Sequence, residues 1–127
     1  MKIVKGLYYS KDHEWIKIEG DRGYIGITDY AQEAMGDIVF IELPDVDESF
    51  AAEDNFAVIE SVKAAADIYL PIGATVIEVN SKLEDEPELL NKAPFDEYIA
   101  IIEGFETDEL ETLMDADAYE AYCNSLE

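Results

Sequence analysis

The chain is very acidic for its size: its 127 residues carry a formal net charge of −23, and 49% of them are apolar. The apolar content is sufficient for a hydrophobic core, so we predict one compact domain over residues 1–127. The charge excludes nucleic acid and disfavours an anionic membrane surface as partners, since a protein that binds either needs a basic patch. It favours partners with basic clefts, or it simply keeps the protein soluble.

Short segments of alternating apolar and polar residues dominate the first hundred positions and predict a mainly β protein. A turn over residues 19–23 joins two of these segments. An acidic loop or weak strand is expected over residues 45–54. The predicted strands cover residues 7–9, 15–19, 24–28, 37–43, 56–62, 68–70, 75–80 and 98–103.

Helical segments are expected at the periphery. Thr28 or Asp29 can cap a helix that runs to Met35, and Gly36 is well placed to end it. Residues 87–91 can form one helical turn. From residue 107 the apolar spacing becomes helical, which predicts two short C-terminal helices, the second capped by Asp115.

Targeting signals and cysteine chemistry are not evident. No apolar run approaches the length of a membrane span, and the first six residues are too short and mixed for a signal peptide, so we expect a cytoplasmic protein. The single cysteine, Cys123, excludes an intrachain disulfide, and the single histidine, His13, lies at the other end of the chain. We therefore expect neither a metal site nor a thiol nucleophile, and we interpret Cys123 as a structural residue.

One segment combines features that could support chemistry. Residues 60–67 read Glu-Ser-Val-Lys-Ala-Ala-Ala-Asp and lie between two predicted strands, so Lys63 is expected at the tip of a hairpin. Its small neighbours leave the amine accessible to a modifying enzyme and leave a long adduct free to swing. Spacing alone favours an ordinary solvated turn lysine over a modification site, since isolated motif matches are often chance.

Residues 60–67 also resemble the lipoylation signature of glycine cleavage H proteins. Biotin carriers usually have methionines on both sides of the modified lysine, whereas Val62 and Ala64 flank Lys63 here. The chain is identified as similar to this family over nearly its whole length. The further blocks that resemble the family, in the same order, are residues 9–15, 26–32, 36–44, 78–80, 87–91 and 94–95.

The resemblance implies a fold and a function. The expected fold is a flattened barrel or sandwich of the lipoyl-domain type (a barrel-sandwich hybrid) with short peripheral helices and C-terminal helices. The expected cofactor is lipoate, covalently bound to Lys63, and the expected function is to shuttle an aminomethyl group on the lipoamide arm. The implied partners are a pyridoxal-phosphate-dependent glycine decarboxylase, an aminomethyltransferase, dihydrolipoamide dehydrogenase, and a lipoate ligase or lipoyltransferase. The chain itself is expected to be a non-catalytic carrier.

The resemblance also implies contacts for the loaded arm, which carries a cationic amine. The matching acidic positions are Glu14 and Asp67, with Asp12 nearby, because carboxylates pair well with an ammonium. Each could instead be a solvated surface acid. Several family glycines are absent, and if the turns at Glu53 and Ala74 require positive φ, these residues cost local stability or force another turn type.

Two other functions remain open from the sequence. An H-like lipoyl carrier could serve a lipoate relay or another redox or sulfur pathway, and an acidic interaction module could act without any cofactor. A stand-alone hydrolase or transferase is disfavoured, because the sequence offers no nucleophile and base pair.

Overall fold

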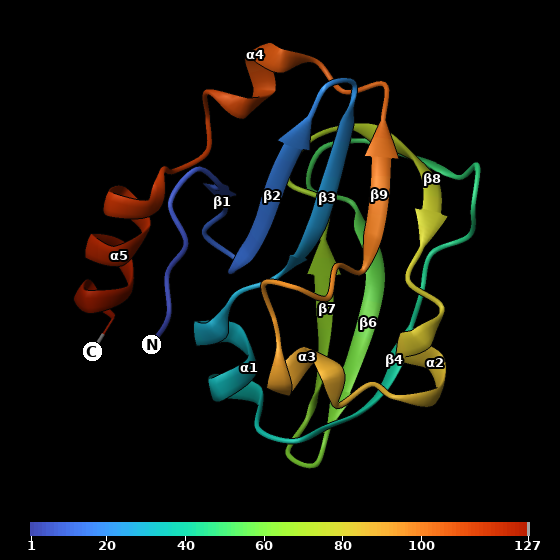
Figure 1. Cartoon of the computed structure of the whole chain (residues 1–127), viewed down its shortest axis with the longest axis vertical. Helices are drawn as coiled ribbons and strands as arrows, with labels where there is room; N and C mark the ends of the chain where they lie inside the picture. The colour runs from blue at the N-terminus through green and yellow to red at the C-terminus, as the bar shows by residue number, and fades with distance from the viewer. Residues whose placement is uncertain (127) are drawn as a thin grey trace.

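The computed structural model describes residues 1–126 and is built mainly from β-strands in two antiparallel sheets. The first sheet contains, in spatial order, β1 (Tyr8–Tyr9), β2 (Glu14–Glu19), β3 (Arg22–Ile27), β9 (Ala100–Glu103), β8 (Ala74–Val79) and β5 (Ser49–Phe50). The second contains β4 (Ile38–Glu42), β6 (Asn55–Ser61) and β7 (Ala65–Tyr69). The described residues form a flattened sandwich in which the sheets do not close into a barrel (Figure 1), which confirms the predicted mainly β class.

Short helices lie outside the sheets. Figure 1 shows α1, α2 and α3 at the end of the sandwich where the β6–β7 hairpin projects, and α5 along the side next to β1. The sequence did not predict α2, a single turn whose apolar anchor is the buried Leu83. The helices are α1 (Asp29–Met35), α2 (Lys82–Asp85), α3 (Leu89–Lys92), α4 (Thr107–Leu110) and α5 (Ala116–Ser125).

Local side-chain chemistry explains where these elements begin and end. Thr28 rather than Asp29 is the N-cap of α1, since its side chain accepts a hydrogen bond from Ala31 N. Gly36 ends α1 with a φ of 77°, a conformation that favours glycine. Asp115 caps α5 as expected, and its carboxylate accepts a hydrogen bond of 2.8 Å from Ala118 N.

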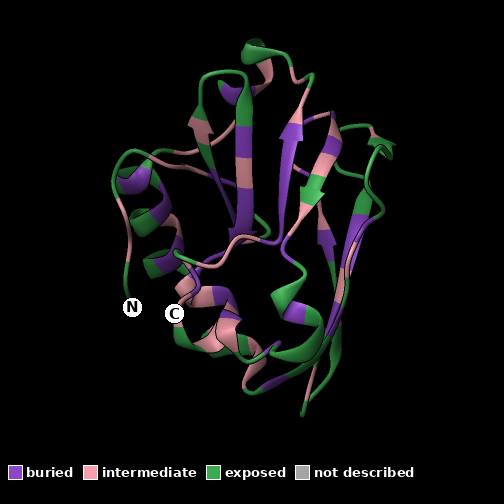
Figure 2. Ribbon diagram, turned by 45° about the vertical axis from the view of Figure 1, so that its right-hand side comes forward, coloured by how far each residue is buried: buried purple, intermediate pink, exposed green. Residues whose placement is uncertain are grey.

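The core lies between the sheets, where the inward side chains of both are buried. Figure 2 shows buried segments within the strands, whereas the turn between β6 and β7 is exposed. A second buried cluster joins α5 to the start of the chain and contains Tyr9, Trp15, Ala116, Tyr119 and Cys123. Cys123 is fully buried, which agrees with its interpretation as a structural residue. Within residues 1–126 no helix has both the length and the apolar composition that crossing a membrane requires.

The two positions at which the resemblance implies a glycine differ in the structure. Glu53 adopts a φ of 71°, so this turn retains the positive φ without glycine and carries the strain that was expected. Ala74 instead begins β8 and is buried, so no positive φ is required there. Positive φ is therefore present at Glu53 and absent at Ala74.

Candidate functional site

Lys63 lies in the turn that joins β6 to β7, where the sequence placed it. The pairing of the two strands ends at Glu60 and Ala65, and the turn is closed by a hydrogen bond of 2.8 Å from Ser61 N to Ala64 O. The Ser61 hydroxyl also accepts from the backbone N–H groups of Lys63 and Ala64, each at 3.2 Å. These bonds order the turn while the side chain of Lys63 stays exposed.

The turn rests on the segment between α1 and β4. Val62 N donates a hydrogen bond of 2.9 Å to Asp37 O, which ties the hairpin tip to this segment. The side chain of Lys63 passes over Gly36, where an added Cβ would lie 3.2 Å from Lys63 Cε. The absence of a side chain at Gly36 therefore leaves room for the aliphatic part of Lys63.

Glu14 lies at the start of β2 and is only 1% exposed. Its Oε1 accepts a hydrogen bond of 2.5 Å from the Ser10 hydroxyl, and its Oε2 accepts one of 3.4 Å from Tyr69 N. Tyr69 is on β7, at the edge of the second sheet, so the Glu14 carboxyl bridges the two sheets. Burial raises the pKa of Glu14 from 4.5 to about 7, an increase that nearby Asp12 supports and the hydrogen bonds from Ser10 and Tyr69 oppose.

The Glu14 carboxyl lines a cavity of about 230 Å³. Asp12 lines the same cavity, whereas Asp67 does not. Because side chains alternate along a strand, Asp67 shares the outward face of β7 with Tyr69, between the Lys63 turn and the cavity. The lining residues are Tyr9, Ser10, Lys11, Asp12, Glu14, Glu53, Tyr69, Pro71, Thr112, Leu113 and Met114. The structure thus brings Glu14 and Asp12 together and leaves Asp67 exposed on the path toward Lys63.

The turn that carries Asp12 and Glu14 is held by α5. His13 adopts a φ of 71°, stacks on Tyr30, and has its Nδ1 2.7 Å from the hydroxyl of Tyr119. The Tyr119 hydroxyl is also 2.7 Å from Thr28 Oγ1. Burial lowers the pKa of His13, which disfavours its charged form. These contacts agree with the packing role inferred for His13. Trp15 also packs and donates to Pro94 O at 2.9 Å.

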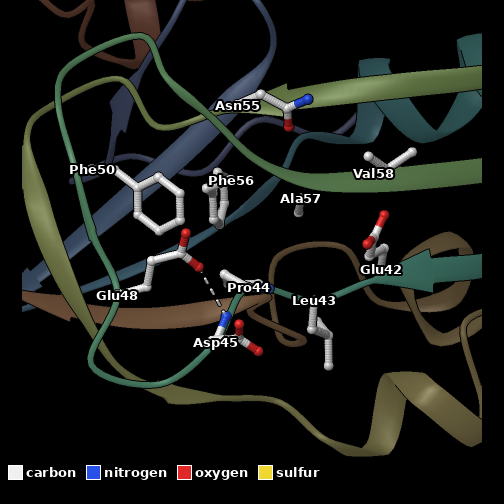
Figure 3. A pocket seen from close by; sticks show the side chains of 10 residues that line it. All are labelled: Glu42, Leu43, Pro44, Asp45, Glu48, Phe50, Asn55, Phe56, Ala57 and Val58. Carbon is white, nitrogen blue, oxygen red and sulfur yellow. Dashed lines mark hydrogen bonds between the residues drawn. The ribbon is translucent and has the colours of Figure 1, made fainter.

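A second cavity, of about 290 Å³, lies between the end of β4 and β6 and contains none of the predicted site residues (Figure 3). Glu42, Asp45 and Glu48 contribute acidic side chains to its lining. Figure 3 shows the Glu48 carboxylate directed at the backbone N of Asp45, a contact of 3.4 Å that fixes the loop. This loop contact explains the orientation of Glu48 without any ligand.

The sequence did not reveal several residues of the site. Ser10, Tyr69 and Gly36 act through a hydroxyl, a backbone N–H and the lack of a side chain, respectively. Ser10 and Gly36 lay within blocks that resembled the H-protein family, which was the available signal. No such signal exists for Tyr69, because the hydrogen bond from its backbone N–H to Glu14 depends on which strand edge faces Glu14.

The fold and site define a class of protein. An exposed lysine at the tip of an ordered hairpin, on a small sandwich with an adjacent acid-lined cavity, is the arrangement expected of a small carrier domain.

Comparison with known proteins identifies the family. Residues 7–126 match the family described as glycine cleavage H-protein. The glycine cleavage system H protein of Alkaliphilus oremlandii is 53% identical over 123 residues, covering 97% of each chain. That of Thermoanaerobacter pseudethanolicus is 49% identical over 122 residues, covering 96% of this chain and 97% of the relative. A crystal structure of the Mycobacterium marinum H protein aligns with a TM-score of 0.76 at 29% identity, covering 87% of this chain and 98% of that one.

The chain belongs to the glycine cleavage H-protein family. Its role is accordingly that of a lipoyl carrier in glycine cleavage, and it is a carrier component of that system.

Proposed function

We propose that Lys63 is the lipoylated residue of this carrier. The observation that supports this proposal most directly is the position of Lys63, which is exposed at the tip of an ordered hairpin and flanked by small residues. When bound, the lipoyl group supplies a disulfide that can be reduced and can carry a one-carbon unit on sulfur. Tethering this group replaces a bimolecular encounter with a high effective concentration.

The residues around Lys63 fit such an attachment. Within residues 1–126 the ion pairs are Lys17 with Glu19 and Lys82 with Glu97, so the Lys63 ammonium is not held by a carboxylate. Ala64 and Ala65 after it are exposed and short, so they leave the approach to the amine open. An enzyme that forms an amide with the lysine would therefore meet little steric hindrance.

Glu14 is proposed as the main contact for a cationic group carried on the arm, with Asp12 beside it and Asp67 on the approach. A carboxyl group that is almost fully buried, with a pKa close to 7, can lose its proton as an ammonium approaches. The resulting carboxylate can then bind the ammonium strongly. Ser10 and Tyr69 hold the two carboxyl oxygens, so the group is oriented before the cation arrives. Asp67 is exposed, so its contact contributes less because water screens it.

The wider assignment follows from the family. We propose that the chain is a non-catalytic, cytoplasmic carrier, with residues 1–127 acting as one domain. Its partners are a pyridoxal-phosphate-dependent glycine decarboxylase, an aminomethyltransferase, dihydrolipoamide dehydrogenase, and a lipoate ligase or lipoyltransferase. The similarity to H proteins over nearly the whole chain supports this assignment over a lipoate relay, a sulfur pathway or a cofactor-free module.

Peptide mass spectrometry of protein purified from its own host, grown with ample lipoate, tests the proposal. The expected result is the lipoyl mass on the peptide that contains Lys63 and on no other lysine peptide. An unmodified Lys63 in cells that lipoylate their other acceptor proteins would overturn it and would favour the cofactor-free module. Genes for the decarboxylase and the aminomethyltransferase next to this one would separate glycine cleavage from a relay.

A further inference from the structure

We propose that Asn91 is a positioning residue for the modification of Lys63, because its side-chain amide fixes the backbone segment on which the Lys63 turn rests. The inference rests on the proposed attachment of lipoate to Lys63. Asn91 lies on α3, far from Lys63 in the sequence, and nothing in the lysine motif itself points to it.

The amide of Asn91 joins the end of α1 to the beginning of β4. Its Nδ2 donates to Gly36 O at 2.9 Å and to Gln32 Oε1 at 3.0 Å. Its Oδ1 accepts a hydrogen bond of 2.9 Å from Ile38 N. An asparagine side chain can make four such bonds, and three are used here across both ends of one short segment. This pattern restrains the backbone of residues 36–38.

The restrained segment in turn holds the Lys63 turn. Asp37 lies between the two residues whose backbone Asn91 binds, and Asp37 O accepts the hydrogen bond from Val62 N at 2.9 Å. Gly36 lies directly beneath the side chain of Lys63, whose Nζ is 3.7 Å from the position of an added Cβ. The path from Asn91 to Lys63 therefore runs through one backbone segment and one hydrogen bond.

The strand ladder restrains this region only in part: Ile38 pairs with Ser61, and the ladder becomes irregular directly after that pair, between Ile38 and Phe40. The pairing of β6 with β7 ends before the turn. The bonds within residues 61–64 shape the turn but do not orient it relative to the rest of the molecule. If the segment 36–38 moves freely, fewer molecules present Lys63 in one orientation, and the apparent affinity of a modifying enzyme falls by that fraction.

The test uses the apo form of the full chain as the substrate of a bacterial lipoate ligase, with ATP and lipoate, followed by intact mass over time. For Asn91→Ala we expect KM for the carrier to rise roughly fivefold to tenfold, because the free energy that orders the turn falls by about the net value of one hydrogen bond. We expect kcat to change by less than about twofold. Amide hydrogen exchange at Val62 should accelerate by a similar factor. Lys92→Ala, an exposed change on the same helix, is the control and should match the wild type in both measurements.

Asn91→Asp is the second variant, for the case that Asn91→Ala fails to fold. It keeps the acceptor for Ile38 N and the shape of the side chain, but it removes both donated bonds and places a carboxylate oxygen against Gly36 O, so KM and Val62 exchange should rise at least as much as in Asn91→Ala. A folded variant with wild-type KM and wild-type exchange at Val62 overturns the inference. Wild-type protein that is not modified at Lys63 overturns the proposed function instead, and the exchange measurement still tests the restraint.

Discussion

The Lys63 turn and the Glu14 cavity place two ionisable side chains in opposite surroundings. Lys63 is exposed, and its turn is ordered by backbone bonds and the Ser61 hydroxyl. Glu14 is 1% exposed and bridges two sheets through its carboxyl oxygens. The difference matches the roles proposed for the two residues, since an attachment point must be reached from outside, whereas a carboxylate that binds a cation gains strength from the exclusion of water.

The largest effect is expected at Lys63, the proposed attachment point. Lys63→Arg keeps the positive charge at an exposed position, so the free energy of unfolding should change by less than about 0.5 kcal/mol. A guanidinium does not form the same amide, so lipoylation and glycine–bicarbonate exchange should fall to background. Intact mass, thermal unfolding and the exchange assay measure the three quantities. Glycine–bicarbonate exchange near the wild-type rate in Lys63→Arg would show that Lys63 is not the attachment point.

The second effect concerns the stability of the buried acid. Because the pKa of Glu14 is raised from 4.5 to about 7, the folded protein binds more protons than the unfolded chain between these values. The contribution of Glu14 to stability is therefore complete below about pH 4.5 and is lost as the pH rises through 7, a change on the order of 3 kcal/mol.

Glu14→Gln removes this titration and keeps the shape of the side chain. The free energy of unfolding of the wild type and of this variant is measured in urea between about pH 4.5 and 8. The wild type should lose stability relative to Glu14→Gln as the pH rises, and taking this difference cancels the effect of the other acids, which both proteins share. Parallel pH dependence would mean that Glu14 is ionised throughout and that its cavity is wetter than the structure indicates.

The third effect separates the three acidic contacts. In lipoylated protein carrying the aminomethyl group, Glu14→Ala should accelerate release of formaldehyde and ammonia by roughly tenfold or more, the value of one buried charge-assisted bond. Asp67→Ala and Asp12→Ala should have smaller effects, since Asp67 and Asp12 are both exposed. Release is measured without the aminomethyltransferase. Equal effects at all three positions would show that burial does not distinguish Glu14.

The smallest effect concerns salt. The exposed acids responsible for most of the charge of −23 should steer association with basic partner clefts, so the association rate should fall several-fold as ionic strength rises. The release rate from the cavity should change little, because the Glu14 contact is shielded from ions. Stopped-flow association with the decarboxylase and the release assay, each at low and high salt, make the comparison. A salt-independent association rate would assign the charge to solubility alone.

Much of the fold was predictable from local patterns. Alternation along residues 15–19 and 24–28 predicted β2 and β3, and Thr28, Gly36 and Asp115 marked helix ends through chemistry that acts within a few residues. The flanking strands also placed Lys63 in a turn. Such features depend on neighbours in the chain, so the sequence contains them in readable form. The assignment of lipoate to Lys63 remains a prediction.

The cavity and the restraint on the Lys63 turn required the tertiary structure. Nothing near Glu14 in the sequence indicates that it is buried or that Tyr69 N meets its carboxyl, because that contact forms only when β2 of one sheet lies against the edge of β7 in the other. Asn91 likewise contacts Gly36 and Ile38 across more than fifty residues. The sequence, through its resemblance to a family, therefore predicted which residue could bear the arm, while packing between distant segments decided which acid is excluded from water and what supports the Lys63 turn.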